Sequence, residues 1–94
     1  MDKKMVNVLA GMFSCTNIGL PMPSVDDVAW AKKNMANHSH ISMMEHFCGS
    51  YIESDEMEEL FRAEADSWHV QLSEMSEDQA RSIWPDAFET YDKA

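Results

Sequence analysis

The chain contains very few of the residues that interrupt regular structure. Its 94 residues include three glycines, Gly11, Gly19 and Gly49, and three prolines. A loop that cradles phosphate with closely spaced glycines is therefore excluded, as is a dinucleotide-binding fingerprint. Neither a G-x-S-x-G nucleophile motif nor an H-E-x-x-H zinc motif is present. We therefore expect a protein that is not an enzyme.

Cysteines and long hydrophobic runs are also scarce. The two cysteines, Cys15 and Cys48, are too few for a disulfide scaffold, so we expect reduced thiols and a cytoplasmic location. No run approaches the roughly 20 apolar residues of a membrane span. The start of the chain weakly resembles a lipoprotein signal, but Asn7 interrupts its apolar run and Phe13 is bulky where a small residue is needed. We expect no membrane association.

Positively charged residues are also few. Seven Lys and Arg stand against 17 Asp and Glu, giving a net charge of −10. Residues 1–44 carry a net charge of +1 and residues 45–94 a net charge of −11, so the acidity belongs to the second half. Such a field repels nucleic-acid phosphates and anionic lipids. Direct nucleic-acid binding is therefore disfavoured, and a basic protein partner is favoured.

The composition is nevertheless that of a folded protein. Apolar residues make up 45% of the chain, and three Trp, four Phe and two Tyr supply large side chains for a core. This length suits a single domain that spans residues 1–94. The nine Met allow two interpretations, core filler or an adaptable apolar binding groove.

The most informative stretch is Glu53 to Leu72. Ser54 is a good N-cap, and the acids that follow suit the positive end of a helix dipole. One predicted face is apolar and comprises Met57, Leu60, Phe61, Ala65, Trp68 and Leu72. The opposite face carries Asp55, Glu59 and Asp66, with Arg62 among them. We expect the rest of the chain to be arranged around this helix.

Other helices are predicted from apolar spacing and capping residues. The expected cap residues are Ser24, either Ser39 or Ser42, and Ser76 with Gln79, while Pro85 suits a first helical turn. The predicted helices span residues 3–13, 24–35, 41–51, 55–72, 76–84 and 86–91. The expected fold is therefore all-α, a compact bundle of about four to six short helices.

A group of metal-binding residue types occurs near the middle of the chain. His38, His40, His46 and Cys48 have side chains that zinc accepts, but their spacing matches no common zinc finger or ribbon. Ordinary core or surface roles are the simpler interpretation, so we predict neither a metal nor another cofactor. A small zinc-binding domain remains an alternative.

The acidic stretch suggests a binding surface. Acids on adjacent helical turns have Cβ atoms about 5 to 6 Å apart, similar to the spacing of phosphates along a nucleic-acid strand. Such a ridge can occupy the DNA-binding groove of a basic protein, although a plain solvated face gives the same pattern. The predicted partner-binding residues are Glu53, Ser54, Asp55, Glu56, Glu58, Glu59 and Asp66.

Small acidic proteins of this kind resemble the DNA-mimic inhibitors of bacteriophages. Glu53 and Ser54, followed by Glu58, Glu59 and Leu60, resemble the Glu-Ser and Glu-Glu-Val segment of phage uracil-DNA glycosylase inhibitors. The resemblance implies that Glu53 and Ser54 lie against the DNA-binding site of the glycosylase. It also implies an apolar groove, here lined by Met, that receives a protruding leucine of the enzyme. That family has a strand where this chain predicts a helix.

Two functions follow as expectations. The first is a DNA mimic that inhibits a DNA-binding enzyme of the host, either uracil-DNA glycosylase or another repair or defence nuclease, in the host cytoplasm. The second is a helical interaction or oligomerisation module, such as a transcription-regulator adaptor, an assembly adaptor or a homo-oligomer, in which Met and Trp form the interface.

Overall fold

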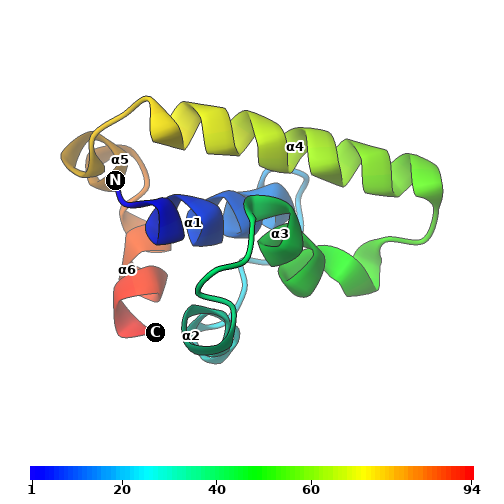
Figure 1. The fold of residues 1–94 in the computed structure, drawn as a ribbon, viewed down its shortest axis with the longest axis horizontal. Helices are drawn as coiled ribbons and strands as arrows, with labels where there is room; N and C mark the ends of the chain where they lie inside the picture. Colours follow the sequence, from blue (N-terminus) through cyan, green and yellow to red (C-terminus); the bar gives the residue numbers. More distant parts are fainter.

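All regular secondary structure in the chain is helical. A computed structural model describes all 94 residues and contains no strand, which confirms the all-α prediction (Figure 1). Its elements are α1 (Lys3–Thr16), α2 (Val25–Asn34), α3 (His40–Cys48), the 3-10 helix η1 (Gly49–Tyr51), α4 (Asp55–Ser73), α5 (Glu77–Ile83) and α6 (Pro85–Lys93).

Serine caps set most of the helix starts, as predicted. Ser24, Ser39, Ser54 and Ser76 each accept a hydrogen bond from the backbone N–H three residues further on. Ser76 and Gln79 form a complete capping box. Of the two candidates for the third helix, Ser39 is the cap. That helix ends at Cys48, earlier than expected, and the chain continues as η1.

Helix α1, not α4, is the centre of the molecule. Every residue from Met5 to Cys15 is buried, whereas α4 buries only one face. In Figure 1, α4 runs along α1 in the antiparallel direction, and α3 packs beside α1. Helices α2 and α6 lie on the side of α1 that faces away from α4. The expectation that the chain is organised around 53–72 was therefore wrong. Helix α1 is short and covered all round, so its burial is not confined to the apolar stripe.

The polar groups buried in α1 have partners. The Asn7 side-chain amide donates a hydrogen bond to the backbone carbonyl of His38 at 3.2 Å, and the Ser14 hydroxyl donates to the carbonyl of Ala10 at 2.7 Å. Because buried polar groups without partners are costly, these bonds allow two polar residues inside the bundle. The Asn7 bond also ties the connection between α2 and α3 to the central helix.

Gly11 allows α1 and α3 to approach closely. A Cβ atom added to Gly11 would lie 2.6 Å from Cβ of Met43 and 2.9 Å from its carbonyl carbon, and real Cβ atoms do not approach so closely. Glycine is a poor helix former, so its position inside α1 needs another explanation. Its role is in packing, because it removes the side chain that would hold the two helices apart.

Cys15 and Cys48 form a disulfide between the C-terminal parts of α1 and α3, so the expectation of reduced thiols was wrong. Their Cα atoms are 5.9 Å apart, within the usual range for a disulfide. The close contact at Gly11, one turn before Cys15, brings the two residues together although they are 33 positions apart. The bond is buried in a small second core with Met44, Phe61 and Ala65.

The methionines are core residues. Met5, Met12, Met35, Met43 and Met44 are buried, and the other four are half-buried. The interpretation as core filler is thereby confirmed over an exposed methionine surface.

None of the helices combines the length and the apolar character that crossing a membrane requires.

Candidate functional site

The start of α4 is a rigid platform. The Ser54 hydroxyl accepts a hydrogen bond from the Met57 backbone N–H at 3.2 Å, which fixes the first turn. On the inner face, Phe61 and Ala65 are buried against the Cys15–Cys48 disulfide. The outer face of this turn is therefore held in a defined position.

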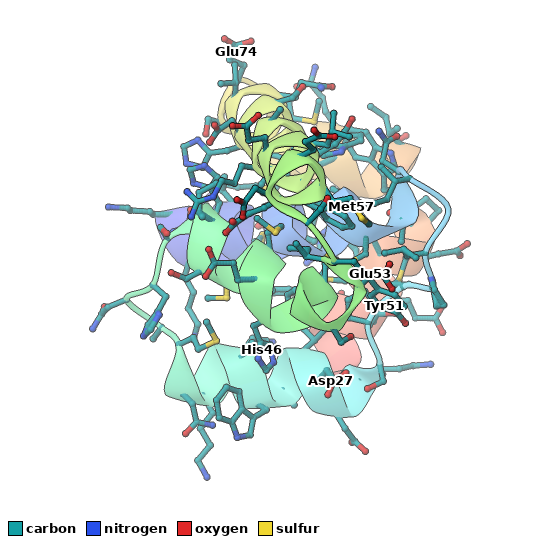
Figure 2. The ribbon with its side chains drawn as sticks, turned by 90° about the vertical axis from the view of Figure 1, so that its right-hand side faces the viewer. Asp27, His46, Tyr51, Glu53, Met57 and Glu74 are labelled. Atoms are coloured by element: carbon teal, nitrogen blue, oxygen red, sulfur yellow. A yellow bond between two sulfur atoms is a disulfide. The ribbon has the colours of Figure 1, made fainter.

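Four carboxylates at this platform have no partner. Glu53, Asp55, Glu56 and Glu59 are exposed and take part in no hydrogen bond or ion pair through their side chains. We call these four residues the acidic end. Figure 2 views the molecule from this side, with Glu53 beside Tyr51 and Met57 where the chain enters α4. The four charges are free to meet cations of another molecule.

The remaining predicted binding residues are already engaged. The Glu58 carboxylate lies 3.6 Å from the Arg62 guanidinium, which also donates to Glu45 at 3.1 Å. The Asp66 carboxylate is 2.6 Å from Nε2 of His40. The structure thus divides the predicted ridge into the acidic end, the Ser54 cap and two carboxylates held by internal partners.

Leu60 is a surface residue that the sequence placed on the apolar face. Its residue surface is 68% exposed, the largest value among the large hydrophobic residues. It lies one helical turn after Glu56 and next to Glu59, and Tyr51 is also exposed nearby in the chain. Leu60 projects at the edge of the apolar stripe, which explains the error. A single exposed leucine is common on protein surfaces, so Leu60 adds an apolar side chain beside the free charges but does not by itself mark a binding surface.

Glu64 has a partner within the protein. It is half-buried, and its carboxylate accepts a hydrogen bond from the Asn17 amide at 2.8 Å. Because Asn17 caps the end of α1, this bond joins α1 to α4.

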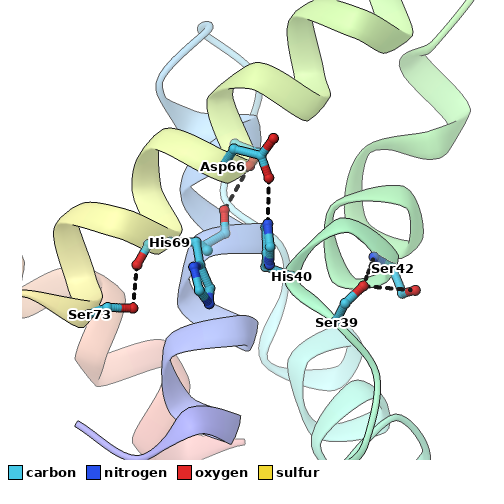
Figure 3. A network of polar contacts seen from close by, with 8 residues as sticks. Ser39, His40, Ser42, Asp66, His69 and Ser73 are labelled. Atoms are coloured by element: carbon cyan, nitrogen blue, oxygen red, sulfur yellow. Dashed lines mark hydrogen bonds and ion pairs between the residues drawn. The ribbon is translucent and has the colours of Figure 1, made fainter.

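A histidine pair joins α3 to α4 away from the acidic end (Figure 3). The rings of His40 and His69 stack with their centroids 4.2 Å apart, and Asp66 lies beside His40. Burial and the neighbouring His40 lower the pKa of His69 below its ordinary value of 6.5, and Lys3 acts in the same direction while Asp66 opposes it.

The lowered pKa of His69 predicts that the protein loses stability in mild acid. A histidine whose pKa is lowered by folding binds protons more weakly in the folded state than in the unfolded state. The free energy of unfolding should therefore be retained above pH 6.5 and fall as the pH drops from 6.5 toward the lowered pKa. Urea titrations between pH 7.5 and 5.5 would measure this fall. His69→Gln should reduce it, whereas the exposed control His38→Gln should not.

The candidate zinc ligands are not brought together. Cys48 is in the disulfide, the His46 ring stacks on Trp30 at 4.9 Å, His40 contacts His69, and His38 is exposed. No group of three or more His, Cys, Asp or Glu side chains is arranged to hold a metal ion. These residues therefore have separate structural surroundings.

Comparison of the chain with protein-family models, curated proteins and solved structures finds no match. The functional argument therefore depends on the surface itself.

Proposed function

We propose that this protein binds a basic DNA-binding protein through the acidic end and blocks its DNA site, as a DNA mimic. The observation that carries the proposal is the set of four unpaired, exposed carboxylates at the capped start of α4. Uracil-DNA glycosylase is the target class that the Glu53–Ser54 resemblance favours. Another repair or defence nuclease is the next.

The geometry suits a phosphate substitute. Glu56 and Glu59 lie on adjacent turns of α4, and such neighbours have Cβ atoms about 5 to 6 Å apart. Glu53 and Asp55 extend the same charge past the Ser54 cap. Because the backbone of the turn is capped before binding, the ordering cost of binding a basic groove comes from the side chains. Leu60 then supplies an apolar contact among the charges.

The alternative of an oligomerisation module has less support. It required an interface of Met and Trp, and none of the nine Met is among the exposed large hydrophobic residues. Of the three Trp, only Trp30 is more than half exposed, at 52%. An apolar interface would also be insensitive to salt, whereas contacts of the acidic end would weaken as salt screens them.

The compartment that we propose remains the cytoplasm, because DNA-binding targets of this class act there. Disulfides persist mainly in oxidising compartments. A cytoplasmic role therefore requires the protein to fold with Cys15 and Cys48 reduced. Alkylation of the thiols in freshly lysed cells, followed by mass measurement, reports which form is present.

Neutralising the acidic end should abolish partner binding. The variant carries Glu53→Gln, Asp55→Asn, Glu56→Gln and Glu59→Gln. Its matched control carries Asp26→Asn, Asp27→Asn, Glu74→Gln and Asp78→Asn, four exposed acids elsewhere, so both variants have the same net charge. Each protein is immobilised, exposed to bacterial lysate and washed at 50 and 300 mM salt, and purified uracil-DNA glycosylase is tested in parallel.

We expect the wild type and the control to retain a DNA-binding enzyme that duplex DNA displaces and high salt releases. The acidic-end variant should lose at least about 100-fold in affinity, equivalent to about 3 kcal/mol for several charge contacts together. Equal losses in both variants would mean that net charge alone matters, and retention independent of salt would favour the apolar module. Either result contradicts the proposal.

A further inference from the structure

A second candidate contact lies beside the last turn of α1, next to the connection between α5 and α6. A pocket of about 320 Å³ is lined there by Phe13, Thr16, Asn17, Met22, Trp68 and residues 83–87. Three aromatic rings form its wall. The Phe13 ring centroid lies 4.9 Å from that of Trp68 and 5.2 Å from that of Trp84, and the two Trp rings meet edge to face at 5.4 Å.

The turn between α5 and α6 holds this pocket in shape. Trp84 precedes Pro85, which disfavours helical backbone at Trp84 and so ends α5 there. The two helices are tied by Arg81, which donates to Glu77 at 2.9 Å and to both carboxylate oxygens of Asp92 at 2.7 and 3.1 Å. This bonding lowers the pKa of Asp92, as expected for a carboxylate held by a guanidinium.

The charge of the pocket selects its ligand. Asp86 is the only charged residue in the lining, and no Lys or Arg contributes to it. The Asp86 carboxylate is exposed and pairs with no side chain of the protein, so it is free to bind a cation. A guanidinium can stack on an indole face and pair with this carboxylate at the same time.

We propose that this pocket binds an arginine side chain of a basic protein partner, with the guanidinium stacked against Trp68 or Trp84 and paired with Asp86. The net charge of −10 favours a cationic partner. The identity of that partner as a protein rests on the proposed function. The preference of the pocket for a guanidinium does not, because it follows from the lining alone.

The test is an NMR titration of the full chain with N-acetyl-L-arginine amide. N-acetyl-L-citrulline amide is the neutral probe of nearly the same shape. The three indole N–H signals report on the site, since Trp68 and Trp84 line the pocket and Trp30 lies elsewhere, between α2 and α3. Asp86→Asn is the informative variant. Asp78→Asn is its control, because Asp78 is also the second residue of its helix and does not line the pocket.

We expect the arginine probe to shift the Trp68 and Trp84 signals with a dissociation constant of about 1 mM, typical of a small ligand with few contacts. Citrulline should bind at least about fivefold more weakly, and Asp86→Asn should weaken arginine binding at least about threefold while Asp78→Asn does not. Circular dichroism checks that both variants keep the wild-type fold.

Three results would overturn the inference: equal binding of the citrulline probe, an unchanged affinity in Asp86→Asn, or shifts at Trp30 as large as those at Trp68 and Trp84. The titration uses no protein partner. A pocket that ignores arginine, in a protein whose acidic end still captures a DNA-binding enzyme, overturns the pocket alone. The converse result overturns the DNA-mimic proposal and leaves the pocket.

Discussion

Reduction of the Cys15–Cys48 disulfide should lower the free energy of unfolding by about 4 kcal/mol. The bond joins residues 33 positions apart in α1 and α3. Cross-linking a loop of this length lowers the conformational entropy of the unfolded chain, which is equivalent to about 4 kcal/mol at 25 °C. Small domains are stable by about 5 to 15 kcal/mol in total. The reduced protein should therefore stay folded at 25 °C, with its melting temperature lowered by about 15 to 30 °C.

Urea titrations followed by circular dichroism, with and without a phosphine reductant, measure this difference. The chain has no other cysteine, so any response to the reductant comes from this bond. The double variant Cys15→Ala, Cys48→Ala should unfold at the same urea concentration with and without reductant. Identical midpoints for oxidised and reduced wild type would show that the bond contributes nothing to stability.

The same bond connects stability with the candidate site. Phe61 and Ala65 of α4 are buried against the two sulfur-bearing residues, two turns or less from Glu59. Loss of the cross-link should therefore loosen the support under the acidic end more than it affects the turn between α5 and α6. In a reducing cytoplasm, the protein would lack this cross-link, and the acidic end would have to bind its partner without it.

Local signals in the sequence were sufficient to predict the helices. Serine caps, acids in first turns and the Pro85 start act within a few residues, so each predicted helix has a counterpart in the structure. The same kind of local pattern predicted an acidic face on α4, and the four residues of the acidic end are exposed.

Long-range contacts could not be predicted in this way. The full burial of α1 depends on which helices cover it, and its own residues do not reveal that. The partner of Asp66 is His40 on α3, 26 residues away, so the sequence could not show that this acid is engaged. Likewise, the pairing of Cys15 with Cys48 depends on the close contact of α1 with α3, which the sequence did not reveal.

Gly11→Ala should destabilise the protein by about 1 to 2 kcal/mol, although alanine is the better helix former. The new methyl group would overlap the backbone of α3 at Met43, so α3 must move away from α1, and overpacking of this kind costs about 1 to 3 kcal/mol. The helix-propensity gain of about 0.5 to 1 kcal/mol offsets only part of this cost. Gly49→Ala is the matched control, since a Cβ at Gly49 meets nothing within 4 Å and its φ of −56° suits any residue. That control should be neutral or slightly stabilising in urea titrations.

The disulfide should make the Gly11→Ala penalty larger. With Cys15 and Cys48 joined, α3 is held against α1 near the overlap and cannot relax freely. In the cysteine-free background α3 can shift, so the penalty should fall by about 1 kcal/mol, a coupling energy typical of residues that share one contact. A double-mutant cycle of unfolding free energies measures this coupling. A penalty of the same size in both backgrounds would mean that the methyl group is accommodated without displacement of α3, and the close approach at Gly11 would then not be what brings the two cysteines together.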